Sequence, residues 1–379
     1  MQDRVNKPDF STAVDYHYGG FPPENVDTAR LMDPLAEAAA AIARYDQMLK
    51  GLHNSELLLA PLQRQEAVIS SRMEGTVSTL DEVLEYEADR EDGDMPASAT
   101  FRQEAIEVHL YAQALRLAQK RMQEGAPLSS FLIKQAHETL LSWGRGAGTS
   151  AGQFKTRQNY LADPVRRKIL FVPIAPEFLN DGMESLIKYM NDTTREVHVR
   201  TAVSHCEFEA LHPFEDGNGR IGRMLITLML WHYKVISAPH FYVSAYFEQN
   251  RDEYIDRMRE VSRTKEWTDW IAFFLHALQY QANENLRTAE RIRNLYEIMK
   301  QETHKIYPTK WSTMVLDFLF SRPIFRSDVF PEKTGIPPPT AGKIRRALVD
   351  NKMLRTIRPA SGRRPALYSF EPLLRILRV

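Results

Sequence analysis

Residues 212–223 combine side chains that can move a proton, hold a cation and bind phosphate. The run reads His-Pro-Phe-Glu-Asp-Gly-Asn-Gly-Arg-Ile-Gly-Arg. His212 can act as a base near neutral pH, and Asp216 can hold a Mg²⁺ ion that bridges it to phosphate oxygens. Gly217 and Gly219 allow a tight turn that exposes consecutive N–H groups. The spacing therefore predicts a binding site for several phosphates beside a base.

A helix that begins near Arg220 is expected to complete this site. Its N-terminus offers further free N–H groups and the positive end of the helix dipole. Arg220 and Arg223 are three residues apart, so they lie on neighbouring positions of the first turn. The apolar residues up to Tyr233 indicate that this helix is buried at the centre of the protein.

A zinc site is a competing interpretation of the same region. His198, His205 and His212 recur every seven residues and can share one helix face. Neighbours in that series lie about 10 Å apart along a helix. This is too far for one metal with ligand distances near ~2 Å, so the spacing argues against zinc.

The composition indicates a globular protein. The chain has 379 residues, of which 43% are hydrophobic, enough for two or three domains with a sizeable core. The single cysteine, Cys206, permits no disulfide within the chain and suits a reducing compartment. No secretory signal is evident, and no run approaches the roughly 20 apolar residues of a membrane span. We therefore expect a cytoplasmic protein with no membrane partner.

The net charge is zero but unevenly distributed. Residues 309–379 carry 14 Lys and Arg against 5 Asp and Glu, whereas the remainder holds 35 basic and 44 acidic residues. This asymmetry predicts a basic module attached to an acidic body. Such a module is compatible with nucleic-acid binding, although many solvated surfaces are also basic.

Helical patterns dominate the first 302 residues, after an irregular arm of about 30 residues. A helical pattern opens at Pro34, and an acidic stretch runs from Asp81 to Asp94. We expect helices at 34–48, 57–73, 101–124, 129–142, 177–191, 197–211, 221–233, 251–261 and 267–278, and a long charged helix to about 302. The extended pieces 156–161 and 168–172, with a turn signal at Asp163-Pro164, predict a β-hairpin.

The C-terminal segment has a different pattern. Three short helices are expected at 311–320, 326–334 and 339–351, followed by extended pieces at 354–358 and 366–370. This is the order of a winged helix-turn-helix. We therefore expect a mainly all-α protein: a helical core with a β-hairpin flap, plus a small α+β winged-helix domain. The predicted domains are 1–110, 111–302 and 309–379.

The run 212–223 resembles the signature of the Fic-domain family, which is His, any, Phe, any, Asp or Glu, Gly, Asn, Gly, Arg, two of any kind, and Arg. Every fixed position is filled. Neighbouring segments are similar too, at 132–140 with His137, 152–156, 171–173 and 246–251. One departure is Lys155, where many relatives have Arg. The likeness covers about residues 57–278 and the C-terminal module.

The resemblance implies a protein adenylyltransferase, which moves AMP from ATP to a Tyr, Thr or Ser hydroxyl of a target protein and of itself. His212 would be the general base, Asp216 would hold Mg²⁺, and Asn218 would seat the α-phosphate region with the backbones of Gly217 and Gly219. Arg220 would hold the β- and γ-phosphates and Arg223 the γ-phosphate. The other expected nucleotide contacts are Glu74, Ile221, Gly222, Asn250 and Tyr254. From the bare sequence, the spacing of Tyr246, Asn250 and Tyr254 is equally consistent with core packing.

A second motif, Ser70-Ser71-Arg72-Met73-Glu74-Gly75, lies near a helix end. Ser70 and Glu74 are four residues apart, hence on one face, and Gly75 is typical of a C-terminal helix stop. Read alone, this is a solvated helix end. It resembles the inhibitory-helix signature of Fic proteins, at about 57–75, which implies that Glu74 pairs with Arg223 and holds ATP in an unreactive pose.

Partners follow from the resemblance and from charge. The hairpin at 157–172 resembles the flap that docks target proteins by strand addition; the alternative is a solvent-exposed hairpin. Basic residues within 337–364 could contact DNA, or the module could serve as a protein-contact surface or contribute to a homodimer. Two other functions stay open. One is an ATP-sensing nucleic-acid-binding regulator, and the other is a phosphodiesterase that removes AMP.

Overall fold

The structure is a computed structural model that describes residues 9–52, 55–90, 103–144, 147, 150–163, 168–307 and 310–378. The chain packs as two compact units, each assembled from segments distant in sequence: Met1–Ala43 with Gln113–Ala282, and Arg44–Ala112 with Asn283–Val379. The division falls inside the helices α1 (Thr28–Lys50), α4 (Gln103–Gln123) and α11 (Thr268–Ile306). The predicted domains 1–110, 111–302 and 309–379 divide the chain differently and stay predictions.

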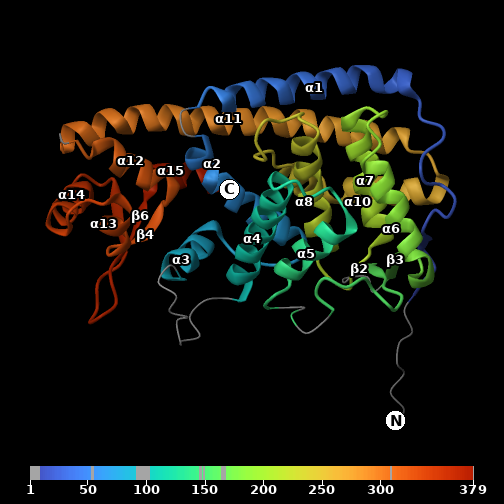
Figure 1. Cartoon of the computed structure of the whole chain (residues 1–379), viewed down its shortest axis with the longest axis horizontal. Coiled ribbons are helices and arrows are strands. Elements are labelled where there is room, and N and C mark those ends of the chain that lie inside the picture. Colours follow the sequence, from blue (N-terminus) through green and yellow to red (C-terminus); the bar gives the residue numbers. More distant parts are fainter. Residues whose placement is uncertain are drawn as a thin grey trace, which may run out of the picture. The chain divides into compact units, whose positions relative to one another are not determined.

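The first unit is a helical bundle centred on α7 (Val197–Leu211) and α8 (Asn218–His232), which pack along each other (Figure 1). The helices α5 (Ser130–Leu140) and α6 (Pro176–Met190) cover this pair, and α9 (Ser244–Gln249) and α10 (Arg251–Thr264) follow it in the chain. The first thirteen residues of α8 are buried, as its apolar sequence predicts. The motif loop, residues 212–217, therefore connects two central helices.

A three-stranded sheet of order β1-β3-β2 belongs to the same unit. The strands β2 (Leu161–Asp163) and β3 (Lys168–Val172) are antiparallel, and β1 (Val14–Asp15) runs parallel to β3. The predicted hairpin is thus present, but its first strand begins at Leu161 instead of residue 156. The predicted turn residue Pro164 lies outside the described residues. The N-terminal arm, expected to be irregular, supplies β1 because its backbone pairs with one edge of β3.

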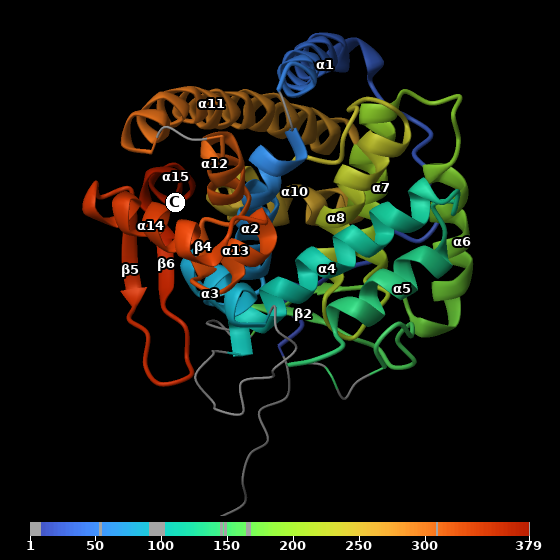
Figure 2. The same cartoon turned by 60° about the vertical axis from the view of Figure 1, so that its left-hand side comes forward.

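The second unit joins α2 (Ser55–Met73) and α3 (Leu80–Arg90) to the C-terminal segment (Figure 2). Helix α12 (Ser312–Ser321) packs on α2, and strand β4 (Ile324–Arg326) packs on α3. A sheet of order β4-β6-β5 follows, with β5 (Leu354–Arg358) and β6 (Leu367–Phe370) antiparallel. The remaining helices are α13 (Val329–Thr334), α14 (Pro338–Asp350) and α15 (Glu371–Leu377).

The mainly helical class is confirmed, with several corrections to individual elements. Helix α1 begins at Thr28 and contains Pro34 in its interior, so Pro34 does not open it. The two helices expected between 267 and 302 are one continuous helix, α11. Strand β4 replaces the start of the helix expected at 326–334, and α15 was not predicted. The acidic stretch forms α3 only to Arg90, and residues 91–102 lie outside the described part.

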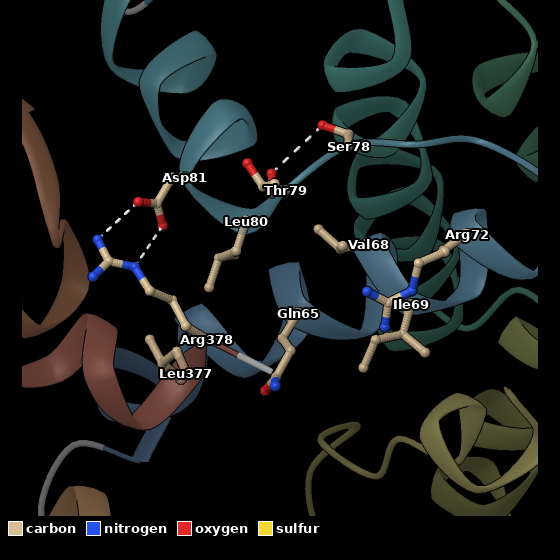
Figure 3. Close-up of a pocket in the computed structure, with 10 residues that line it drawn as sticks. All are labelled: Gln65, Val68, Ile69, Arg72, Ser78, Thr79, Leu80, Asp81, Leu377 and Arg378. Carbon is tan, nitrogen blue, oxygen red and sulfur yellow. Dashed lines mark hydrogen bonds and ion pairs between the residues drawn. The ribbon is translucent and has the colours of Figure 1, made fainter. Parts of the chain in front are cut away.

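A cavity of about 250 Å³ lies within the second unit, between α2, the beginning of α3 and the end of α15. Figure 3 shows Arg378 reaching Asp81 at the start of α3, with hydrogen bonds of 3.1 and 2.7 Å. Arg72 of α2 lines the same cavity. The segment that carries the predicted inhibitory motif is therefore packed together with the C-terminal helix. No helix in the described part of the chain is long and apolar enough to cross a membrane.

Candidate active site

Two left-handed residues shape the motif loop. His212 caps the end of α7 with φ 44° and ψ 61°, and Gly217 precedes α8 with φ 79°. Such a conformation suits glycine, but it costs a histidine on the order of 1–3 kcal/mol. A Cβ at residue 217 would also approach Leu140 to 3.2 Å. The loop thus needs glycine at 217 and external support at 212.

Asn218 and Phe214 close the loop on itself. The side chain of Asn218 accepts a hydrogen bond from the Phe214 N–H (2.8 Å) and donates one to the Phe214 oxygen (2.8 Å). The ring of Phe214 is fully buried and stacks on His137 at 3.7 Å. The side chain predicted to seat the α-phosphate region is therefore bonded within the loop, and its contact with a nucleotide stays a prediction.

The tautomer of His212 follows from its hydrogen bond. Its Nδ1 atom lies 3.4 Å from the main-chain oxygen of Glu209. A carbonyl oxygen can only accept, so Nδ1 carries the proton and Nε2 keeps its lone pair. The imidazole, which is half-buried, can therefore take a proton at Nε2.

Arg220 is a buried cation with unused hydrogen-bonding capacity. Its side chain is 2% exposed, and its Nη2 atom contacts Oδ1 of Asp216 at 3.4 Å. Within the described residues, Nε and Nη1 have no hydrogen-bond partner. The N-terminus of α8 also has no side-chain cap there. A buried guanidinium and an uncapped helix start are groups that can together hold an anion.

Asp216 offers one carboxylate to a metal ion. Its Oδ1 atom accepts from the N–H of Gly217 at 2.6 Å, and its side chain is 38% exposed. No cluster of three or more His, Cys, Asp or Glu suited to a metal occurs in the described residues. A single carboxylate fits Mg²⁺, which takes most of its remaining ligands from water and phosphate.

His137 supports the loop from α5. Its Nδ1 atom accepts from the N–H of Gly152, and its Nε2 atom donates to the oxygen of Asp216, both at 2.9 Å. Burial lowers the pKa of His137 to about 4. The ring is therefore neutral at pH 7, with its proton on Nε2.

The next turn of α8 is packed against neighbouring helices. Ile221, a predicted nucleotide contact, is buried, and its N–H group already donates a hydrogen bond to the oxygen of Gly217. The oxygen of Gly222 lies 3.1 Å from Nδ1 of His205. Burial, with the charge of Arg223 nearby, lowers the pKa of His205 to about 3. Arg223 itself is 2% exposed.

The predicted contacts to base and ribose lie where α9 meets α10. Asn250 separates the two helices, and its amide donates to the oxygen of Tyr246 at 2.9 Å. Tyr254 is buried, and its hydroxyl donates to Nε2 of His205 at 2.7 Å. The packing role left open for Tyr254 is therefore present, and its nucleotide role stays a prediction.

The predicted inhibitory residues lie in the second unit. Helix α2 ends at Met73, and Gly75 follows with φ 83°. Glu74 is thus the first residue beyond the helix instead of a member of its last turn, and Ser70 is fully buried. Arg223 belongs to the first unit, so its pairing with Glu74 stays a prediction.

Sequence reasoning missed a buried network at the middle of α7. The carboxylate of Glu207 accepts from the hydroxyl of Tyr16 at 2.7 Å and contacts Nε2 of His17 at 2.8 Å. Nδ1 of His17 lies 2.9 Å from the hydroxyl of Ser262 on α10. Glu207 is about 190 positions from Tyr16 and His17 in the sequence, and no local spacing indicates the contact.

Several known proteins are similar to parts of this chain. The protein adenylyltransferase fic-1 of Caenorhabditis elegans is 30% identical over 101 residues, which are 26% of this chain and 18% of that protein. The probable protein adenylyltransferase aq_aa38 of Aquifex aeolicus is 28% identical over 206 residues, 54% of this chain and 57% of its own. A uridine 5'-monophosphate transferase of Xanthomonas campestris is 28% identical over 125 residues, 31% of this chain and 23% of its own. This chain therefore spans less than two thirds of each of these relatives.

A solved structure has the same fold. The Fic family protein from Desulfovibrio desulfuricans superimposes with a TM-score of 0.58 at 19% identity, over 92% of this chain and 98% of that one. Two sequence profiles also match, the Fic/DOC family N-terminal profile at residues 32–120 and the Fic/DOC family profile at 127–230. They span about half of the 379 residues and include the whole motif up to Arg223. The chain belongs to the Fic/DOC family.

Proposed function

We propose that this protein transfers AMP from ATP to a hydroxyl of a target protein, and of itself, and releases pyrophosphate. The observation that carries the proposal is Arg220, a buried guanidinium whose Nε and Nη1 atoms lack partners among the described residues. It lies in the first turn of an uncapped helix, a few residues after His212. A polyphosphate that ends at a reacting centre suits this arrangement.

The proposed reaction uses the base and the anion site together. Nε2 of His212 takes the proton of a Tyr, Thr or Ser hydroxyl, and the oxygen attacks the α-phosphorus. The bond from the α-phosphorus to the bridging oxygen of pyrophosphate breaks as the new bond forms. Arg220 and the first N–H groups of α8 neutralise the phosphate charge. Asp216 would hold Mg²⁺, which neutralises phosphate charge when bound.

The test is incorporation of label from α-³²P-ATP into the protein and into added lysate proteins. We expect His212→Ala to lose at least 10²-fold of the transfer rate while it retains ATP binding. Parallel reactions with α-labelled UTP identify the donor, because one relative bears the name of a uridine 5'-monophosphate transferase. Label from UTP but not ATP would overturn the donor assignment, and label from neither, in any variant, would overturn transfer.

We propose that Glu74 restrains this activity by pairing with Arg223. Support comes from the position of Glu74 directly after α2 and from the burial of Arg223 on α8. A carboxylate on Arg223 competes with a γ-phosphate for the same cation. We expect Glu74→Gly to raise self-modification strongly, and equal incorporation by wild type and variant would contradict this. If Glu74 instead orients water for removal of AMP, preformed label is lost faster from the wild type.

We propose that the target segment docks on the hairpin 157–172 as an added strand. Strand β1 of the N-terminal arm covers the β3 side of the hairpin, so within the described sheet a target would extend the hairpin on its β2 side. The segment 337–364 is proposed to contact DNA, and the fold order of residues 310–378 is consistent with a winged helix. A homodimer and a cytoplasmic location stay proposals.

A further inference from the structure

Residues 155–159, which precede β2, donate hydrogen bonds to the main chain at the end of α7 and in the motif loop. The carbonyl oxygens of residues 211–214 each accept from them: Leu211 from Nζ of Lys155 (3.0 Å), His212 and Phe214 from Nδ2 of Asn159 (3.1 and 3.0 Å), and Pro213 from the N–H of Lys155 (2.8 Å). Two side chains and one N–H group thus hold four consecutive peptides around the base.

Lys155 is also hydrogen-bonded to Asn159. Its Nζ atom donates to Oδ1 of Asn159 at 2.8 Å. The main-chain oxygens of His212 and Phe214 can only accept, so the amide of Asn159 must turn Nδ2 toward them, and its Oδ1 atom is left to accept from Lys155. The two side chains therefore act as one unit.

The cost of burying Lys155 indicates that the contact is specific. The residue is 3% exposed, and its Nζ atom donates to two oxygens that carry no net charge, those of Asn159 and Leu211. Burial lowers the pKa of Lys155 to about 7. A neutral amine still donates two hydrogen bonds, which match the two acceptors, Leu211 and Asn159. The bonds can therefore persist on both sides of neutral pH.

His212 lies between these contacts and has a strained backbone conformation. His212 has φ 44°, and a strained residue persists only when its surroundings over-determine its conformation. Asn159 lies two residues before β2, the proposed docking strand. We infer that Lys155 and Asn159 are positioning residues that hold His212 in its left-handed conformation and fix its distance from a hydroxyl docked on the hairpin. This inference rests on the proposed function.

The first test converts the donor of Asn159 into an acceptor. Asn159→Asp places a carboxylate against the oxygens of His212 and Phe214. In the Glu74→Gly background, we expect the single-turnover rate of self-modification to fall on the order of 10²-fold, because a displacement of about 1 Å has such an effect. ATP affinity should change less than about threefold, since Arg220 is untouched. The matched control is Gln153→Glu, the same chemical change at an exposed residue near Lys155, and it should keep the parent rate.

The second test uses rescue at Lys155. Lys155→Met keeps the length of the side chain but removes the hydrogen bonds that Nζ donates to Asn159 and Leu211. It should lower the rate of self-modification and leave the ATP affinity unchanged. Lys155→Arg restores donors and should recover most of the rate. A purely structural role predicts a different pattern, in which rate, affinity and melting temperature fall together. Equal rates for Lys155→Met and the parent would overturn the inference.

A spectroscopic readout separates failure of this inference from failure of the proposed function. With ¹³Cε1-labelled histidine, the His212 resonance, assigned through His212→Ala, should shift or broaden in Asn159→Asp and stay unchanged in Gln153→Glu. An unchanged resonance in Asn159→Asp would overturn the positioning role even if no AMP transfer is ever found. If Asn159→Asp fails to fold, Lys155→Met gives the same decision.

Discussion

The Nε2 atom of His137 donates a hydrogen bond of 2.9 Å to the main-chain oxygen of Asp216. The same ring accepts from the N–H of Gly152 and stacks on Phe214, so one neutral imidazole joins α5, the segment before the hairpin and the motif loop. The proposed metal ligand therefore takes its position from a residue 79 places earlier in the chain. This relationship makes the loop sensitive to acid.

We predict that His137→Phe weakens the protein at pH 7 and flattens its acid sensitivity. Loss of the bonds to Gly152 and Asp216 should cost about 1–3 kcal/mol. Burial lowers the pKa of His137 from 6.5 to about 4, so the unfolded chain binds the extra proton between these values. The stability is therefore fully present above 6.5 and is lost as the pH falls toward 4. Between pH 7 and 5 the wild type should lose about 2 kcal/mol that the variant does not. Urea unfolding at both pH values measures this, and equal pH dependences would contradict it.

We predict that Arg220→Met separates stability from binding. Without nucleotide, the variant should be as stable as the wild type or more stable, because a buried guanidinium with unpaired N–H groups destabilises the fold. ATP affinity should fall on the order of 10²-fold, since contacts to a charged group contribute about 1.5–3 kcal/mol each. Urea midpoints without ATP and the rise in melting temperature with ATP measure the two effects. Arg257→Met, at a partly exposed residue of α10 that forms only surface ion pairs, should change both by little. A large loss of stability without nucleotide would show that Arg220 is structural.

The sequence predicted the motif far better than the contacts that hold it. The residues of 212–223 were found because their roles depend on types and spacing within twelve positions. The left-handed end of α7 at His212 was recognised only as a helix end. Its partners Lys155 and Asn159 lie more than fifty positions away, and an amide that faces two carbonyl oxygens has no local signature. Tertiary packing, not periodicity, selects such pairs.

The helices and strands were also predicted unequally well. The long apolar helix α8 was predicted almost to its bounds, because burial on all sides is visible in its composition. The short strands β1 and β4 were not, since two or three residues carry no period and form only against their partners β3 and β6. Pro34 was read as a helix start, yet it lies inside α1.

We predict that Gly222→Ala impairs the site through Glu209. A Cβ at residue 222 would overlap Oε1 of Glu209, so the side chain of Glu209 must move. The main-chain oxygen of Glu209 accepts a hydrogen bond from Nδ1 of His212. A shift of Glu209 should therefore misplace His212, and the rate of self-modification should fall on the order of tenfold or more. Gly342→Ala in α14 is the control, because nothing lies within 4 Å of its Cβ position. It should stabilise the fold by about 0.5–1 kcal/mol. Equal rates in Gly222→Ala and the wild type would contradict the role of Glu209.

We predict that Asp89→Asn tightens DNA binding. The carboxylate of Asp89, 10% exposed on α3, contacts Nη2 of Arg358 at 2.9 and 3.1 Å and Nη2 of Arg364 at 3.4 Å. Both arginines lie within the segment 337–364 that is proposed to contact DNA, so the carboxylate of Asp89 would compete with DNA phosphates for them. Releasing the two arginines should raise the affinity for a mixed-sequence DNA duplex several-fold. The slope of log affinity against log salt concentration should steepen by the amount expected for about one to two further phosphate contacts. Fluorescence anisotropy of the full chain at 50 and 200 mM salt measures both. Glu297→Gln, which removes one exposed charge of α11, is the control for a general charge effect. If both variants match the wild type, Arg358 and Arg364 serve to join the C-terminal segment to α3 and not to bind DNA.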